Sequence, residues 1–222
     1  MASARAADVA STLASLYDIR SLRTYVRWKV RSDPAYAAVL ARVRDYAQPL
    51  LDLGCGVGLL PFYLREHGVG VPILGIDFDD RKIDVARKAA QRYRGIDFIR
   101  GDARDALPEG HNIVILDILQ YFPTADQKRI LTQVAKAVAP EGIVVIRSGV
   151  RDASWRFRIT RAVDAFGRAI RWMRAESLNY PAREEIVGAF DGFHAGVTPL
   201  WGGSPFNNYL FVFTRGAARR PE

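Results

Sequence analysis

The residues with the clearest capacity for chemistry lie in the segment Asp52-Leu53-Gly54-Cys55-Gly56-Val57-Gly58, which joins a short apolar run to a helical pattern. A strand that enters a glycine turn and then a helix brings its backbone N–H groups close to a ligand. Glycine is needed there because a Cβ would intrude. A segment of this kind on its own is explained equally well as a simple tight turn. Its function therefore depends on what accompanies it.

Carboxylates recur at the ends of the next predicted strands. Asp77, Asp102 and Asp117 each end a short apolar run, as Asp52 does before the glycines. In doubly wound sheets an acid after the second strand accepts both ribose hydroxyls of a nucleotide. Each acid alone is also explained as a helix N-cap. Because all four fall at the carboxyl ends of consecutive strands, where open α/β sheets bind ligands, we expect a nucleotide-type cofactor site.

A nicotinamide dinucleotide is the natural rival ligand, and the glycine spacing disfavours it. The dinucleotide fingerprint requires G-x-G-x-x-G. Here Gly58 comes one residue too soon, and Leu59 follows it.

At these residues the chain resembles the class I S-adenosylmethionine-dependent methyltransferases, whose glycine motif matches 52–58 almost letter for letter. The resemblance covers about residues 49–149, and the C-terminal hairpin in topology. It implies that S-adenosylmethionine is the cofactor and that the protein is an enzyme. It also implies that Asp77 binds the ribose, that Phe78 forms an apolar wall for the adenine, and that Asp102 with the amide of Ala103 holds the ring edge. The other cofactor contacts implied on the sheet are Asp52, Gly54, Cys55, Gly56, Gly58 and Asp117.

The elements that must position these residues alternate between strand and helix. The predicted strands are 49–53, 71–77, 96–101, 112–117 and 142–149, with helices over 57–67, 80–93 and 124–138. Thr124 with Gln127 predicts a capping box for the last of these helices. Such alternation favours a doubly wound α/β fold with a mostly parallel sheet. The runs 193–200 and 207–214 are too close for a helical crossover, so we expect a C-terminal antiparallel hairpin and seven strands in all.

Residues 1–48 are predicted to form a helical lid or cap over the methyltransferase domain, 49–222, within one globular protein. Asp33 and Pro34 fit the N-cap and first position of a helix. The resemblance implies that Tyr25 and Arg27 neutralise the methionine carboxylate. Packing of the aromatic residues against the sheet explains this region equally well.

The methyl acceptor is narrowed by what the sequence lacks. The fourth strand continues as Asp117-Ile118-Leu119-Gln120-Tyr121-Phe122, unlike the Asn/Asp-Pro-Pro-aromatic motif of amino-methylating nucleobase enzymes. The single cysteine lies in the glycine loop, so it does not serve carbon-5 cytosine methylation. The fifth strand ends in Arg147-Ser148-Gly149, which does not suit metal-assisted catechol methylation. A small molecule remains, with Tyr121 and Arg147 as candidate catalytic residues. Asn207 and Asn208 are further candidates for substrate contact, although the chemistry of a hairpin turn explains the two amides equally well.

A second resemblance refines the acceptor. The segments Tyr25-Val26-Arg27-Trp28-Lys29 and Arg147-Ser148-Gly149, together with Trp201, resemble methyltransferases encoded with bacterial aryl polyene pigments. That resemblance implies methylation of a phenolic ring, at carbon or oxygen, on a free aryl acid or on a carrier-bound aryl chain.

Composition sets the remaining limits. The 222 residues carry a net charge of +8, with one Cys and three His. These counts disfavour a disulfide framework and a structural metal, and the absence of an apolar run of membrane-spanning length favours a cytoplasmic location.

A predicted helix over 153–175 has an apolar face with arginines around it. The residues on this face are Trp155, Ile159, Val163, Phe166, Ile170 and Met173. Core packing explains that apolar stripe; the alternative is docking to an acidic acyl carrier protein or an anionic membrane surface. The charge also leaves open an RNA methyltransferase, although nucleic acid is the less favoured partner, and the lack of an obvious catalytic base leaves open a non-catalytic cofactor-binding module.

Overall fold

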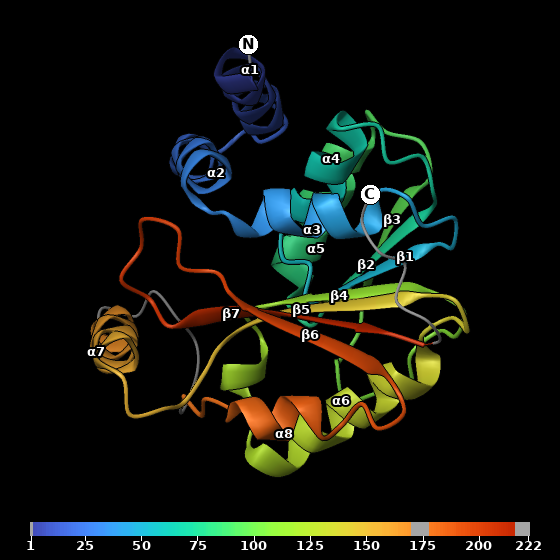
Figure 1. Cartoon of the computed structure of the whole chain (residues 1–222). Helices are drawn as coiled ribbons and strands as arrows, with labels where there is room; N and C mark the ends of the chain where they lie inside the picture. The colour runs from blue at the N-terminus through green and yellow to red at the C-terminus, as the bar shows by residue number, and fades with distance from the viewer. Residues whose placement is uncertain (1, 170–177, 216–222) are drawn as a thin grey trace. The chain divides into compact units, whose positions relative to one another are not determined.

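The computed structural model describes residues 2–169 and 178–215. Its strands form a seven-stranded sheet in the order β3-β2-β1-β4-β5-β7-β6, which confirms the predicted Rossmann-like methyltransferase fold with an antiparallel C-terminal hairpin (Figure 1). The chain divides into two compact units, Met1–Ala103 and Arg104–Glu222. The predicted boundary near residue 48 lies inside the first unit.

The first unit begins with three helices and continues with three strands. The helices are α1 (Ala2–Ser15), α2 (Arg20–Ser32) and α3 (Ala35–Val43); they are followed by β1 (Leu50–Leu53), α4 (Leu59–Glu66), β2 (Ile73–Asp77), α5 (Asp80–Ala90) and β3 (Ile96–Arg100). The three strands are parallel, with β2 hydrogen-bonded to both β1 and β3. All four residues of β1 are buried, as expected for a strand covered on both faces.

Acidic side chains accept backbone N–H groups at the starts of two helices in the first unit, α3 and α5. The Asp33 carboxylate accepts a hydrogen bond from the Ala35 N–H, and Lys29 forms an ion pair with it at 2.6 Å. The chain therefore turns sharply between α2 and α3. Asp79 caps α5 by accepting the Arg81 N–H.

The second unit completes the sheet. It contains β4 (Asn112–Leu116), a short 3₁₀ turn η1 (Leu119–Tyr121), α6 (Thr124–Ala137), β5 (Ile143–Gly149), α7 (Trp155–Ala169), α8 (Arg183–Val187), β6 (His194–Pro199) and β7 (Asn208–Thr214). Strand β5 pairs in parallel with β4 and antiparallel with β7, and β6 pairs antiparallel with β7. Every residue of β5 is buried. The antiparallel pairing of β6 with β7 confirms the predicted hairpin, whose strands were expected over 193–200 and 207–214.

The predicted capping box of α6 is wrong. Pro123 is the N-cap, and Thr124 accepts a hydrogen bond from the Asn179 side chain instead of capping the helix. The buried Gln127 amide donates to the carbonyls of Leu119, Phe122 and Asn179 at 2.6–3.0 Å. This side chain therefore fastens the loop after η1 and the segment before α8 onto the start of α6, a long-range role that the local pattern did not reveal.

The predicted burial of the apolar stripe on the helix after β5 is also wrong. In α7, Trp155 is 57% exposed and Val163 is 46% exposed, whereas Phe157 and Thr160 are buried. Phe157 packs edge-on against Tyr180, which fixes the rotation of the helix. The predicted helix residues beyond Ala169, 170–175, all lie outside the described residues. None of the described helices is long and apolar enough to cross a bilayer.

Candidate functional site

The glycine loop between β1 and α4 has a backbone that other residues adopt only with strain. Gly54, Gly56 and Gly58 have φ values of 84°, 56° and 82°. A Cβ on Gly58 would lie 2.5 Å from Cζ of Phe98, whereas a Cβ on Gly56 would meet no atom within 4 Å. Gly58 is therefore required by packing, and Gly56 borders open space where a ligand can approach the backbone.

Asp77, the last residue of β2, holds this loop in place. One carboxylate oxygen accepts the Gly56 N–H at 2.9 Å, and the other accepts the Asp79 N–H at 3.0 Å. The N–H groups of Gly54 and Cys55 both donate to the carbonyl of Ile76. The loop is thus pinned to the end of β2 by the residue predicted to bind the ribose.

Asp52 is buried within β1. Burial, together with the nearby charge of Asp77, raises the pKa of the Asp52 carboxyl to about 8. Its carboxyl forms no hydrogen bond or ion pair within the described residues. A cationic group brought next to it would favour its ionised form.

The other residues predicted for the cofactor lie around the same strand ends. Phe78 follows β2 and is 64% exposed, so its ring is available to a ligand. Asp102 and the buried Ala103 follow β3. Cys55 is buried beneath the loop, and its burial raises the pKa of the thiol, which keeps it protonated and unreactive.

The turn between α1 and α2 is tied to the glycine loop. The buried Tyr17 hydroxyl donates to the Val57 carbonyl at 3.0 Å, and Arg23 donates to the Tyr17 carbonyl. No local sequence pattern signals the first bond, because its partners are 40 residues apart. Tyr25 and Arg27 lie on α2 and are exposed. Their contact with a methionine carboxylate remains a prediction.

In the second unit, an ion pair occupies the carboxyl ends of β4 and β5. Arg147 on β5 pairs with Asp117, which directly follows β4 and has a φ of 58°, unusual for a residue other than glycine. The buried Gln120 amide donates to the Asp117 carbonyl at 2.9 Å and so supports the strained turn. Tyr121, the last residue of η1, is partly exposed. Two predicted residues, Asp117 and Arg147, are therefore brought together, and Gln120 lies beside them.

Asn207 serves the fold, which corrects the prediction that it contacts substrate. Its buried amide donates to the Val150 carbonyl and to the Asp152 carboxylate, and its N–H donates to Thr160. These bonds join the loop before β7 to the start of α7. Asn208 is also buried, as the first residue of β7.

No group of three or more His, Cys, Asp or Glu side chains among residues 2–169 and 178–215 has the geometry to bind a metal ion.

Comparison with protein families identifies residues 50–142 as a methyltransferase domain. This span contains the glycine loop, Asp77, Asp102 and Asp117. It ends just before β5.

Among curated proteins, the chain is similar to carboxy-S-adenosyl-L-methionine synthases. It is 30% identical over 129 residues to that of Pasteurella multocida, covering 52% of this chain and 54% of the relative. It is 26% identical over 153 residues to that of Klebsiella pneumoniae, covering 63% and 62%. The chain thus spans about half to three-fifths of the length of these relatives.

Solved structures share the fold at low sequence identity. A magnesium protoporphyrin IX methyltransferase from Synechocystis with bound SAH has a TM-score of 0.62 and 15% identity, covering 90% of this chain and 89% of that one. An O-methyltransferase family protein from Burkholderia thailandensis has a TM-score of 0.68 and 19% identity, covering 90% and 61%.

Proposed function

We propose that the chain methylates a small molecule with S-adenosylmethionine as its cofactor, since residues 50–142 match a methyltransferase domain. The observation that supports this most strongly is the glycine loop, which has left-handed backbone at three positions and is pinned by Asp77. Such a loop is already shaped for a ligand and needs no rearrangement to accept one.

The residues of the first unit fit the cofactor. Gly56 leaves open space beside the backbone, Phe78 offers an exposed aromatic face, and Asp77 offers carboxylate oxygens at the end of β2. The buried Asp52 adds a carboxyl whose ionisation a positively charged ligand would favour. We assign the methionine end to the neighbourhood of Asp52 and the ribose to Asp77.

When bound, S-adenosylmethionine supplies an electrophilic methyl group on a sulfonium. The protein then has to orient a nucleophile in line with it and exclude water, because much of the acceleration comes from positioning. In our proposal Arg147 binds an anionic group of the acceptor, and Tyr121 packs against its ring. Asp117 and Gln120 hold Arg147 and the strained turn in place.

The acceptor that best suits these residues is a phenol or hydroxyaryl acid. Its oxygen or an activated ring carbon takes the methyl group, and the proton it loses passes to solvent. The resemblance to aryl polyene methyltransferases and the aromatic and cationic character of Tyr121 and Arg147 support this assignment. More specifically, we propose that the acceptor is an aryl chain attached to an acidic carrier protein. The exposed Arg158 and Arg161 on α7 support this, because their charges would attract such a protein.

A screen with methyl-labelled S-adenosylmethionine tests the proposal. Phenols, hydroxyaryl acids and their carrier-protein thioesters are incubated with the full chain, and labelled products are separated by chromatography. We expect label in at least one hydroxyaryl product. Label in added RNA alone, or binding of cofactor with no turnover on any acceptor, would contradict it.

The curated relatives suggest a second activity, the formation of a carboxylated cofactor. It is favoured by the 25–30% identity over 129–153 residues to proteins named for that product. Mass spectrometry of the cofactor after incubation with cell extract distinguishes the two. A carboxylated cofactor without a methylated acceptor would replace our assignment.

A further inference from the structure

Helix α2 presents a basic face to solvent, of which only Arg27 is also predicted to contact the cofactor. Arg20, Thr24, Arg27, Trp28 and Arg31 recur at steps of three and four residues, so they share one side of the helix. The opposite side contains the buried Val26. We call this set of five residues the α2 outer face.

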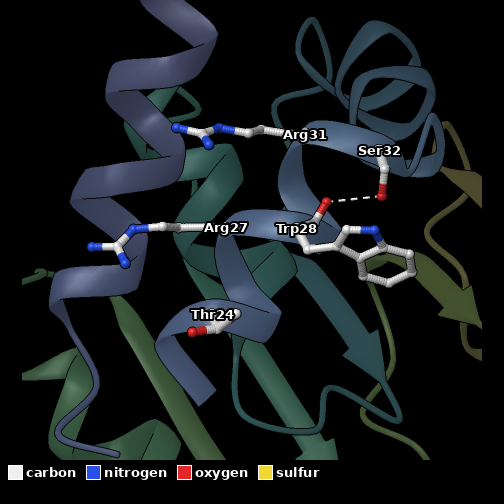
Figure 2. A pocket seen from close by; sticks show the side chains of 5 residues that line it. All are labelled: Thr24, Arg27, Trp28, Arg31 and Ser32. Atoms are coloured by element: carbon white, nitrogen blue, oxygen red, sulfur yellow. Dashed lines mark hydrogen bonds between the residues drawn. The ribbon is translucent and has the colours of Figure 1, made fainter. Parts of the chain in front are cut away.

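The α2 outer face includes an exposed tryptophan at its edge. Trp28 is 62% exposed, although burial of so large an apolar side chain is strongly favourable. Together with Thr24, Arg27, Arg31 and Ser32 it lines a shallow surface cavity of about 400 Å³. Figure 2 shows the two arginines extending to one side of the helix and the indole to the other. Tryptophan and arginine are the residues most enriched at the energetic centres of protein interfaces.

The charge of α2 is one-sided. The helix contains five basic residues, Arg20, Arg23, Arg27, Lys29 and Arg31, and no acidic residue. Arg23 and Lys29 are engaged by Tyr17 and Asp33 within the first unit. Among the described residues, Arg20, Arg27 and Arg31 form no ion pair. Their charges are therefore available to a partner.

From this charge and geometry we propose that the α2 outer face docks an acidic helix of a partner protein. Arg27 and Arg31 are one helical turn apart, about 6 Å along the axis. Carboxylates spaced one turn apart on a neighbouring helix match that separation, and guanidinium groups bind carboxylates in a bidentate manner. Trp28 supplies an apolar contact beside the charged pairs.

Two other kinds of anionic partner fit the face less well. A helix that lies in a membrane interface needs a broad apolar face, and here a single indole is surrounded by arginine and hydroxyl side chains. RNA binding draws its affinity from many neutralised phosphates, and three guanidinium groups on one convex helix are few.

Fluorescence anisotropy with a synthetic probe tests the proposal. The probe is a labelled amphipathic helical peptide with glutamates one turn apart, and its reference is the same peptide with glutamines. The full-length protein is expected to bind the glutamate peptide at least about tenfold more tightly than the glutamine peptide, and added salt should weaken the binding. Equal binding of the two peptides would overturn the proposal.

Substitutions on the face supply the second part of the test. Trp28→Ala, Arg31→Gln and the double variant Arg20→Glu/Arg31→Glu should each weaken binding of the glutamate peptide, the double variant by about tenfold or more. The matched control is Arg42→Glu/Arg44→Glu, which changes the charge equally at exposed positions outside α2 and should alter binding by less than about twofold. Thermal melting verifies that each variant is folded.

Exchanging the charges of the peptide and the protein tests whether binding depends on ion pairs between them. A peptide with lysines in place of the glutamates should bind the Arg20→Glu/Arg31→Glu variant better than it binds the unmodified chain. The control variant losing as much affinity as the face variant would overturn the proposal. So would tighter binding to phosphatidylserine vesicles or to single-stranded RNA than to the glutamate peptide, with loss on the same substitutions.

Discussion

Asp77 and Asp117 each stand at the carboxyl end of a parallel strand, yet the two are held differently. Asp77 is fixed by backbone N–H groups of Gly56 and Asp79, so its position depends on the course of the main chain. Asp117 is fixed by the side chain of Arg147 and by the Gln120 amide on its carbonyl. We therefore expect the position of Asp77 to persist when nearby side chains are substituted. The position of Asp117 should change when Arg147 or Gln120 is substituted.

This difference corresponds to the division of labour in our proposal. In our proposal the cofactor is bound by a backbone cradle that persists when nearby side chains are substituted. An acceptor that differs between family members is served by side chains, which substitution retunes without disturbing the main chain. The predictions below test whether the first unit is rigid and cofactor-directed and whether the second is adjustable and acceptor-directed.

The largest effect is expected for Gly58→Ala. Alanine would have to adopt the left-handed backbone of this position, which strains a residue that carries a Cβ. The new Cβ would also overlap the Phe98 ring, whose Cζ lies 2.5 Å away. We expect a loss of about 3 kcal/mol in the free energy of unfolding, measured by urea denaturation. Gly56→Ala is the matched control, because a Cβ at this position would meet no atom within 4 Å. We expect this variant to lose about 1 kcal/mol in the free energy of unfolding and to bind the cofactor more weakly. Equal stability losses would show that packing does not distinguish the two positions.

Removal of the Asp77 carboxylate comes next. Asp77→Ala deletes charge-assisted hydrogen bonds to the loop and to the ribose, so affinity for S-adenosylmethionine should fall by about 2–3 kcal/mol, or about 30- to 150-fold. Calorimetric titration measures this. Asp84→Ala, at an exposed position on α5, changes the charge equally and should leave the affinity near that of the unmodified chain. Full affinity in the Asp77 variant would refute the ribose assignment.

Disruption of the ion pair between Arg147 and Asp117 should lower the free energy of unfolding by less than Gly58→Ala does. It should affect turnover more than cofactor affinity. In a double-mutant cycle with Arg147→Met and Asp117→Asn, we expect a coupling of about 1–2 kcal/mol in the free energy of unfolding. Arg147→Met should reduce turnover of a hydroxyaryl acid far more than it reduces affinity for S-adenosylmethionine. If affinity and turnover fell together, Arg147 would have to be reassigned to the cofactor.

The smallest effect concerns the proton on Asp52. With a pKa of about 8 in the free protein, this carboxyl is mostly protonated at pH 7, and a cationic ligand that favours the carboxylate must release the proton. Cofactor affinity should therefore rise with pH, by about fivefold between pH 7 and pH 8, and level off at higher pH. Calorimetry at pH 7 in buffers of different ionisation enthalpy should detect the released proton.

Asp52→Asn supplies the control for that effect and a further check. The variant should release no proton on binding. Since the folded-state pKa of Asp52 lies above its unfolded value, stability contributed by the protonated form is lost as pH rises from about 4 to about 8. The neutral amide of the variant avoids this loss, so the variant should melt at a higher temperature than the unmodified chain at pH 8. A lower melting temperature would mean that the buried carboxylate is stabilised by contacts other than those described.

The strands and the glycine turn of the first unit were predicted from sequence because their information is local, whereas the bond from Tyr17 to Val57 was not predicted. A strand, three glycines and an acid one strand later specify both the turn and its ligand, and the structure places Asp77 on the amide of Gly56. The seven strands and the C-terminal hairpin were likewise predicted from the alternation of strands and helices and from the short connection between the last two strands.

The second unit was predicted less well because its contacts are distant in sequence. Gln127 binds the carbonyl of Asn179, and Asn207 binds Asp152, across more than 50 residues in each case. Local rules instead gave Gln127 a capping role and Asn207 a substrate role. For α7, periodicity identified the apolar stripe, but the ring contact between Phe157 and Tyr180 decides which face is buried. Arg147 and Asp117 were each selected from sequence, yet their pairing was not.

Calorimetric titration of the unmodified chain with S-adenosylmethionine and, separately, with NAD tests the central claim most directly. The account predicts saturable one-to-one binding of S-adenosylmethionine and no binding of NAD, because the loop lacks the third glycine of the dinucleotide fingerprint. Binding of NAD without binding of S-adenosylmethionine would contradict it.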